Sequence, residues 1–285
     1  MRGRRKDTTS PSSAPEGPTP GGPVPASVYT EQYFLECAAG GDAFFESGGL
    51  ALHSVTLDLM DELGIGPGCR VIDVGSGRGE FALNVASRGA VVVGVDYAPA
   101  ALRLARSALE QNADLADRTV FVRADAKALP AATSTIDVVS MLDVVEHLRP
   151  AELEAALVEV RRVLRPQGRL CIHTMPNRNF YQYVYPLLRV VARVIQRRRT
   201  GRDPRSSYEH EMHVNEQTPG SLRRILQQVG FDIELRLFGF EKSPLAPGYL
   251  NGVISKVALL PGMRRLGAFH IVVMARPRNP PGTGE

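Results

Sequence analysis

The sequence predicts an α/β protein built on a doubly wound, mostly parallel sheet. Three observations support this fold class. Short apolar runs, as expected for buried strands, alternate with segments of helical periodicity. The first run, Val71–Val74, leads directly into a glycine-rich loop. Four runs end on polar residues, and the carboxyl ends of parallel strands meet at one edge of a sheet, where ligands bind. The 285 residues suit one domain of about 200 to 250 residues with appendages.

The loop after the first strand carries Gly75, Gly77 and Gly79. Glycines permit positive φ in a tight turn and let a ligand approach the bare backbone. The G-x-G-x-G spacing is not the G-x-G-x-x-G of dinucleotide folds, and no Lys-Ser/Thr follows as in a P-loop. Asp73, at the end of the strand, would repel phosphate. The loop therefore favours a nucleoside with a cationic or zwitterionic tail; the alternative is an ordinary glycine-rich turn of an unrelated α/β protein.

The next three strands end on polar residues as well. Val91–Val95 is followed by Asp96, roughly twenty residues past the glycine loop, where a carboxylate can accept hydrogen bonds from ribose hydroxyls. The run 120–122 leads to Asp125, and the run 136–141 leads to the segment 142–148. We expect these side chains to converge with Asp73 on one ligand-binding edge.

Helical patterns fill the intervals between these runs. Pro99 lies in the first turn of one helix, and Pro150 lies in the first turn of the next. Arg165–Gly168 is expected to end the helix 151–164 before the fifth strand. The predicted helices are 50–63, one beginning near Glu80, 98–111, 151–164, 180–195 and one beginning at Thr218, and the fifth strand is 169–173.

Four motifs, in this order and at these separations, resemble the class I S-adenosylmethionine-dependent methyltransferases. They are V-I-D-V-G-S-G-R-G from Val71, V-V-G-V-D ending at Asp96, R-A-D-A around Asp125, and D-V-V-S-M-L-D-V-V-E-H-L ending at Leu148. The resemblance covers roughly residues 64–276. It implies a Rossmann-like fold of seven strands, an enzyme that transfers methyl groups, and S-adenosyl-L-methionine as cofactor. It also implies a closing hairpin, for which 231–238 and 270–276 are the candidates, with one antiparallel strand.

The resemblance also implies roles for individual residues. Asp73 and the loop residues would flank the methionine moiety, Asp96 would bind the ribose hydroxyls, and Tyr97 would lie against the adenine. Asp125 with Ala126 would meet the amino edge of the base. The segment from Leu142 to His147 would border the cofactor and open toward the substrate. The predicted cofactor residues are therefore Asp73, Gly75, Ser76, Gly77, Gly79, Asp96, Tyr97, Asp125, Ala126 and Leu142.

The composition divides the chain into four parts. Residues 1–26 are rich in Ser, Pro and Gly and are expected to form a disordered tail, as are residues 279–285. Residues 27–63 would form an N-terminal helical cap, and residues 64–278 the main domain, with an insertion at 176–217. No run is long enough to span a membrane, and the three scattered cysteines fit a reducing cytoplasm.

The insertion is expected to determine the substrate. Its helix 180–195 is followed by Arg197, Arg198 and Arg199. We favour a lid whose basic end complements the helix dipole; the alternative is an amphipathic element that contacts an anionic membrane peripherally through 180–199. Aromatic residues expected to line an acceptor pocket are Tyr33, Phe44, Tyr181 and Tyr208.

His147 is the first candidate for a general base, because histidine titrates near neutral pH. His210 and His213 come second, and Asp143 could orient or assist. The alternative for His147 is a structural role, as a residue at the start of a helix that is hydrogen-bonded to the backbone. His210 and His213 do not form an H-E-x-x-H motif, so no metal site is expected.

These features predict methyl transfer to a hydroxyl or activated carbon of a medium-sized, partly apolar metabolite, such as a natural product, glycoside, quinone or lipid intermediate. Two alternatives stay open. An RNA-directed methyltransferase would want a coherent basic surface or an added RNA-binding module, and neither is visible, so no nucleic-acid partner is expected. A cofactor-binding regulatory protein would not need polar residues at all four strand ends. The sequence does not predict an oligomeric state.

Overall fold

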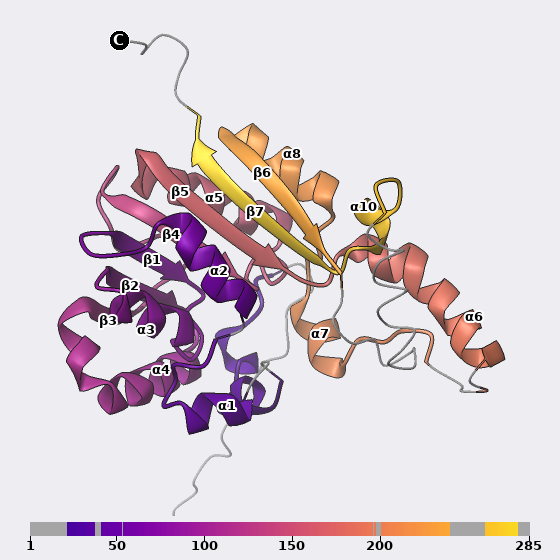
Figure 1. Cartoon of the computed structure of the whole chain (residues 1–285), viewed down its shortest axis with the longest axis horizontal. Helices are drawn as coiled ribbons and strands as arrows, with labels where there is room; N and C mark the ends of the chain where they lie inside the picture. The colour runs from indigo at the N-terminus through magenta and orange to yellow at the C-terminus, as the bar shows by residue number, and fades with distance from the viewer. Residues whose placement is uncertain are drawn as a thin grey trace, which may run out of the picture.

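The structure is a computed structural model that describes residues 22–37, 41–52, 54–195, 197, 201–239 and 260–278. Most of the two predicted tails (residues 1–21 and 279–285), and Arg198 and Arg199, lie outside the described residues. The described residues form a seven-stranded sheet in the order β3-β2-β1-β4-β5-β7-β6 (Figure 1). The strands are β1 (Arg70–Val74), β2 (Val91–Asp96), β3 (Thr119–Arg123), β4 (Ile136–Leu142), β5 (Leu164–Thr174), β6 (Phe231–Phe238) and β7 (His270–Pro277).

β1 to β5 pair in parallel, and β7 runs antiparallel to both of its neighbours. This topology confirms the predicted doubly wound sheet and its closing hairpin. Glycine and polar residues follow the parallel strands at one edge, because all five strands point the same way.

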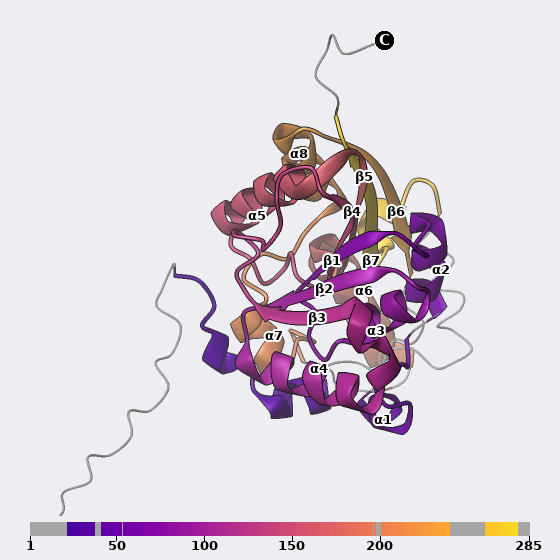
Figure 2. The same cartoon turned by 90° about the vertical axis from the view of Figure 1, so that its left-hand side faces the viewer.

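Helices cover both faces of the sheet (Figures 1 and 2). α5 and α8 pack on one face, and α2, α3 and α4 on the other. The α-helices are α1 (Gly41–Glu46), α2 (Ser54–Leu63), α3 (Glu80–Ser87), α4 (Pro99–Gln111), α5 (Pro150–Val163), α6 (Tyr185–Ile195), α7 (Ser207–Met212), α8 (Pro219–Val229) and α10 (Arg264–Gly267), and the shorter helical turns are η1 (Ala26–Val28), η2 (Tyr33–Cys37), η3 (Ala113–Arg118) and η4 (Phe180–Val184). None of the helices in the described ranges is long and apolar enough to cross a membrane.

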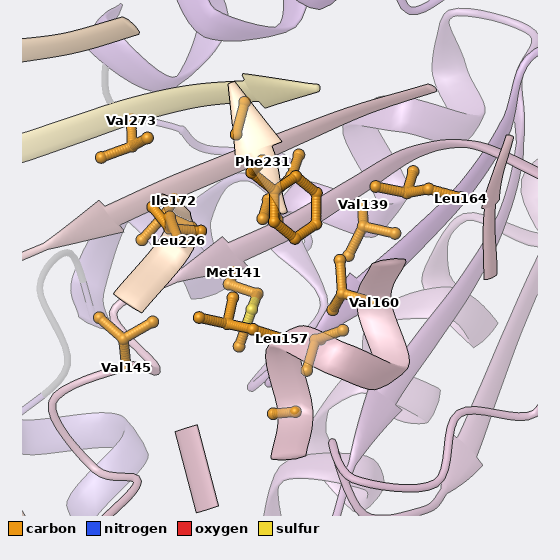
Figure 3. Packing of buried hydrophobic residues seen from close by; sticks show 14 of the residues in the cluster. Val139, Met141, Val145, Leu157, Val160, Leu164, Ile172, Leu226, Phe231 and Val273 are labelled. Carbon is orange, nitrogen blue, oxygen red and sulfur yellow. The ribbon is translucent and has the colours of Figure 1, made fainter. Parts of the chain in front are cut away.

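Alternating side chains of the strands build the two cores. Ile72 and Val74 of β1 join the core under α5 and α8, whereas Val71 joins the core under α2 and α3. A fully buried side chain of this size stabilises the fold by about 1.5–3 kcal/mol. Figure 3 shows part of the first core, where side chains of α5, α8 and the sheet interlock: Val139, Met141, Leu157, Val160, Ile172, Leu226 and Phe231.

Local chemistry explains where several helices begin and end. α4 and α5 begin with a proline at the first helical position, as predicted. The Thr218 hydroxyl accepts a hydrogen bond from the Ser221 amide at 3.0 Å and caps α8, and Gly230 ends this helix at φ 94°. The predicted helix 180–195 instead consists of the π-helical turn η4 followed by α6, and α2 begins at Ser54 rather than at Leu50.

The fifth strand begins five residues earlier than predicted. Arg165–Gly168 was expected to be a break, but β5 runs from Leu164 and pairs there with Ile136. The register shifts between Ile136 and Val138, which accommodates the extra residues as a β-bulge. An ion pair of 2.5 Å between Arg165 and Asp137 holds the irregular stretch beside β4.

Candidate active site

A cavity of about 350 Å³ opens at the carboxyl edge of the sheet. Its walls come from the ends of β1, β2 and β4, from the segment after β3, and from the N-terminal segment. Nine residues predicted to bind cofactor or acceptor, or to act in catalysis, line it: Tyr33, Gly75, Gly77, Asp96, Tyr97, Asp125, Ala126, Asp143 and His147. The fold therefore brings together residues that are more than a hundred positions apart in sequence, such as Tyr33 and His147.

The glycine loop requires glycine at its first position. Gly75 has φ 70°, and a Cβ atom there would lie 2.4 Å from Cγ2 of Val144. The amides of Gly75 and Ser76 both donate to the carbonyl of Val95, at 2.7 and 3.0 Å. The loop is therefore fixed to the end of β2, and its bare backbone faces the cavity.

Asp96 is held by backbone amides at the end of β2. Its Oδ2 accepts from the Gly77 amide at 3.0 Å, and its Oδ1 accepts from the Ala98 amide at 2.8 Å. Burial raises the pKa of Asp96, and these amide bonds oppose the increase. The carboxylate thus ties the glycine loop to the start of α4 and lines the cavity beside Tyr97.

Asp125, which follows β3, belongs to a chain of charges. The Lys127 ammonium lies 2.9 Å from the carboxylates of both Asp125 and Glu152. Lys127 and Glu152 also line the cavity, although neither was predicted. Lys127 and Glu152 could not be assigned to the site from sequence, because this requires knowing how α5 lies relative to β3, which no local pattern gives.

Four predicted cofactor residues do not line the cavity: Asp73, Ser76, Gly79 and Leu142. Asp73 is buried, accepts a hydrogen bond from the Ser140 hydroxyl at 2.7 Å, and has its pKa raised to about 7 by burial. Ser76 is buried, and its hydroxyl has no partner among the described residues. Gly79 precedes α3 where a Cβ would lie 2.7 Å from the Phe121 ring, and Leu142 packs against the core under α2 and α3. These four residues therefore pack within the loop and the sheet and not on the cavity wall.

Asp143 turns its carboxylate into the cavity from the end of β4. Its backbone has φ 54°, a conformation disfavoured for residues other than glycine. The side chain is 51% exposed because it faces the cavity, and Oδ1 lies 2.8 Å from Nδ1 of His173. Nε2 of His173 is in turn 3.1 Å from Nδ1 of His270. Three side chains on β4, β5 and β7 therefore form a connected row.

This row keeps Asp143 charged. Although half of its surface is open to the cavity, Asp143 lies deep in the protein, and this desolvation opposes its ionisation. The neighbouring His173 imidazole outweighs the desolvation and lowers the pKa of Asp143. Burial likewise works against a charge on His173, yet Asp143 raises the pKa of His173 overall. The pair therefore holds an anionic carboxylate at the cavity wall near neutral pH.

His147 also lines the cavity, and it contacts Tyr29 and His213. Its Nδ1 is 3.0 Å from the Tyr29 hydroxyl, and its ring centroid is 4.9 Å from that of His213. Burial, with a contribution from His213, lowers the pKa of His147 to about 3. The imidazole is consequently neutral at physiological pH.

Glu146 lies next to these histidines and belongs to the segment predicted to border the cofactor, although it was not named as a site residue. Burial, followed by the charge of Asp143, raises the pKa of Glu146 well above its usual value, and its Oε2 accepts from the Thr174 hydroxyl at 2.9 Å. Glu146, His147 and His213 each offer one ligand atom, and these atoms lie within 4.8 Å of one another. His210 is separate from this group: it is exposed, and its Nε2 lies 3.4 Å from Asp203.

The predicted acceptor residues fall in three places. Tyr33 lines the cavity, and the Tyr208 ring lies behind it at a centroid distance of 5.8 Å. Phe44 packs into the core under α2 and α3, with the Arg78 guanidinium 4.8 Å from its ring. Tyr181 contacts Tyr185, Phe269 and Arg205 and does not line the cavity.

The N-terminal segment closes one side of the cavity. Pro23, Val24, Pro25 and Ala26 line it, and Val24 is buried with its carbonyl accepting from the Tyr97 hydroxyl at 3.2 Å. Residues up to 26 were expected to belong to a disordered tail, so the predicted boundary is too late for residues 22–26. The low-complexity composition of this segment does not indicate that Val24 is buried, because its contacts form only in the folded protein.

The lining fits the nucleoside implied by the resemblance. A volume of about 350 Å³ lies in the range of small-ligand pockets. Four carboxylates, Asp96, Asp125, Asp143 and Glu152, face a cavity whose only lining Lys or Arg among the described residues is Lys127, which is already paired. Such a lining attracts a cationic ligand and repels phosphate. S-Adenosyl-L-methionine carries a sulfonium and an ammonium group, and the bare backbone of Gly75 and Gly77 leaves room for its approach.

Comparison with known proteins agrees with this geometry. A family described as a methyltransferase domain matches residues 72–172. A ubiquinone biosynthesis O-methyltransferase of Hahella chejuensis is 32% identical over 208 residues, which cover 70% of this chain and 78% of that protein. A demethylmenaquinone methyltransferase of Thermus thermophilus is 37% identical over 131 residues, which cover 42% of this chain and 57% of that protein.

A solved structure with the same fold is a SAM-dependent methyltransferase from Archaeoglobus fulgidus, with a TM-score of 0.52 and 21% identity over 78% of this chain and 92% of that one. The two similarities are of different kinds: the structural match supports the fold, and the sequence match supports the family. Taken with the glycine loop and the carboxylates that face the cavity, they establish that this chain belongs to the S-adenosylmethionine-dependent methyltransferases.

Proposed function

We propose that this enzyme methylates a hydroxyl group on a medium-sized, partly apolar metabolite, with an activated carbon as the alternative acceptor atom. The observation that carries the proposal is the anionic Asp143 carboxylate at the cavity wall, beside aromatic residues of the N-terminal segment. The similar proteins from Hahella chejuensis and Thermus thermophilus, named for ubiquinone and demethylmenaquinone, support a phenol- or quinone-like acceptor.

Methyl transfer needs an aligned acceptor, and a hydroxyl acceptor must also lose its proton. S-Adenosyl-L-methionine, when bound, supplies a methyl group that is already activated by the sulfonium. The protein's part is to hold the acceptor oxygen, receive its proton and exclude water. Tyr29, Tyr33 and Phe34 would cover the acceptor, because their rings form one contact group on the N-terminal side.

Asp143 is the stronger candidate for the proton acceptor. In this step the acceptor O–H bond breaks, the proton moves to the Asp143 carboxylate, and the electron pair stays on the oxygen that takes the methyl group. His173 would orient the carboxylate through the contact of 2.8 Å. His147, first in the sequence-based ranking, has its Nδ1 already engaged with the Tyr29 hydroxyl, whereas the Asp143 carboxylate is half exposed at the cavity wall.

Labelled S-adenosyl-L-methionine tests the proposal. The full-length protein is incubated with a panel of hydroxylated quinone precursors, glycosides and polyketides, and with tRNA. We expect label in a phenolic hydroxyl of an acceptor that carries an apolar side chain. Label in tRNA alone would favour the nucleic-acid alternative, and no transfer to any acceptor, with S-adenosylhomocysteine still bound, would favour a regulatory protein.

Three variants separate the candidate bases once an acceptor is found. Asp143→Asn should lower kcat by about 10²–10⁴, while the affinity for S-adenosylhomocysteine, measured by calorimetry, stays within a few-fold. His210→Ala is the control and should retain wild-type turnover, because His210 lies outside the cavity lining. If His147→Ala loses turnover and Asp143→Asn does not, His147 is the base.

A further inference from the structure

α6 presents apolar side chains on two opposite sides. Leu188 and Ala192 are buried against the protein, as expected for a packed helix. Leu187, Val190 and Val194 are 65%, 60% and 72% exposed. At about 100° per residue these three fall within an arc of about 60°, on the side away from the buried pair. The outward face of a surface helix is ordinarily polar, so this face is built for an apolar environment.

A second group of exposed apolar residues lies beside this helix. Leu260, Met263 and Leu266 are exposed in and next to α10. The carbonyl of Arg265 accepts from the side-chain amides of Asn177 and Asn179, and the Phe180 ring lies 5.2 Å from that of Phe269. These contacts fix α10 to the beginning of η4. α6 and α10 together form the end of the molecule farthest from β3 (Figure 1).

The exposed apolar residues are concentrated here rather than scattered. Thirteen large apolar side chains are exposed among the described residues, and seven of them belong to η4, to α6 or to the residues in and next to α10: Tyr183, Leu187, Val190, Val194, Leu260, Met263 and Leu266. We call these seven residues the apolar face. Concentration of this kind marks an interaction surface, whereas single exposed residues do not.

The charged residues of α6 and α10 are all arginines. Arg193, Arg197, Arg264 and Arg265 are exposed, and none forms an ion pair with any described residue. From Arg178 to Arg202 the sequence contains seven arginines and no Asp or Glu. Arginine places its charge at a phosphate while its stem covers apolar surface. A second copy of the chain would bring arginines against arginines, which disfavours a symmetric dimer.

We propose that α6 and α10 dock this enzyme on an anionic phospholipid surface. α6 would lie in the plane of the interface, with Leu187, Val190 and Val194 among the acyl chains and the flanking arginines at the phosphates. The inference rests on the apolar face and its charge, and is independent of which acceptor the enzyme methylates. Under this proposal the predicted basic helix contacts a membrane rather than acting as a lid.

Vesicle flotation of the full-length protein tests the docking surface. The vesicles are phosphatidylcholine alone and phosphatidylcholine mixed with phosphatidylglycerol. We expect binding to the anionic vesicles to exceed binding to the neutral ones by at least about tenfold, and to weaken with added salt. The variant L187Q/V190Q/V194Q should lose at least about tenfold in binding, and so should R193E/R264E/R265E.

The matched control is V120Q/V158Q, which replaces exposed valines of β3 and α5, outside the apolar face, and should bind vesicles like the wild type. Calorimetry with S-adenosylhomocysteine, expected within twofold of wild type for every variant, shows that the fold is intact. Wild-type protein that ignores anionic vesicles would overturn the proposal. So would equal losses in the control, or a dimer in solution that only the α6 variant dissociates, since the face would then belong to a second copy.

Discussion

Asp73 and Asp143 carry the same side chain near the same edge of the sheet, yet their pKa values shift in opposite directions. Asp73 is enclosed below the glycine loop, where burial raises its pKa to about 7. Asp143 lines the cavity and faces His173, which lowers its pKa despite burial. Neighbours and solvent access, rather than residue type, therefore decide which carboxylate is charged at the site.

The raised pKa of Asp73 predicts a pH dependence of stability. In the unfolded chain Asp73 titrates near 3.8, and in the folded protein near 7. Between these values the folded state keeps a proton that the unfolded state has lost, so this group stabilises the fold below pH 3.8, and its contribution declines as the pH rises toward 7. Across that interval the decline amounts to at most about 4 kcal/mol.

Asp73→Asn removes this contribution, so the difference in unfolding free energy between wild type and variant measures it. The free energy of unfolding of wild type minus that of the variant, measured by denaturant titration, should fall as the pH rises from 4 to 7. The depressed pKa of His147 acts in the opposite direction, because it stabilises above pH 6.5 and the effect is lost on acidification. It is present in both proteins and cancels. A difference that does not vary with pH would mean that Asp73 has an ordinary pKa.

At the scale of elements, the β1–α3 connection combines backbone strain with close packing. Gly75 needs both a positive φ and the absence of a Cβ, since a methyl group would lie 2.4 Å from Val144. Gly64 at the end of α2 has nearly the same φ, 68°, but nothing lies within 4 Å of its would-be Cβ. Comparing the two glycines therefore separates the cost of backbone strain from the cost of a steric clash.

Gly75→Ala and Gly64→Ala measure these two effects. Gly64→Ala should cost about 1–2 kcal/mol of unfolding free energy, the strain of a left-handed alanine. Gly75→Ala should cost about 1–3 kcal/mol more, because Val144 must shift. The double variant Gly75→Ala/Val144→Ala should recover part of that excess. Equal losses for the two single variants, measured by chemical denaturation, would show that the contact with Val144 is not tight.

At the scale of the whole molecule, the cavity is closed by two distant parts of the chain. The sheet edge supplies the glycine loop and the carboxylates, and the N-terminal segment covers them with Val24, Tyr29 and Phe34. The cover is tied to α4 and α7 through a shared apolar cluster that includes Ala101 and Met212. A bound nucleoside should therefore hold the cover and the sheet edge together.

Hydrogen exchange can follow this coupling. S-Adenosylhomocysteine should slow exchange of the amides in residues 29–35, in the loop 75–79 and in residues 96–98, because local opening then costs the binding energy as well. The β6 edge, residues 231–238, is remote from the cavity and serves as the internal control. Protection confined to the sheet edge, with residues 29–35 unchanged, would mean that the N-terminal segment does not close over the cofactor.

Sequence patterns predicted the sheet, its doubly wound topology and most of the sheet-edge residues of the cavity. Each of these follows from short-range rules. A buried parallel strand reads as an apolar run, as at Val71–Val74, and a left-handed turn against a packed side chain requires glycine, as at Gly75. Asp96 and Asp125 could be placed because parallel strands end at the same edge.

Only the tertiary structure decided which polar groups touch. The row Asp143–His173–His270 crosses β4, β5 and β7, and the antiparallel position of β7 brings its histidine beside β5. Val24 lines the cavity although its surroundings in sequence resemble a flexible tail. Leu187, Val190 and Val194 look like core residues of an ordinary helix, because sequence periodicity cannot tell which apolar side a helix turns to the protein. Contacts between distant segments and exposure to solvent are properties of the packed molecule, and no local pattern encodes them.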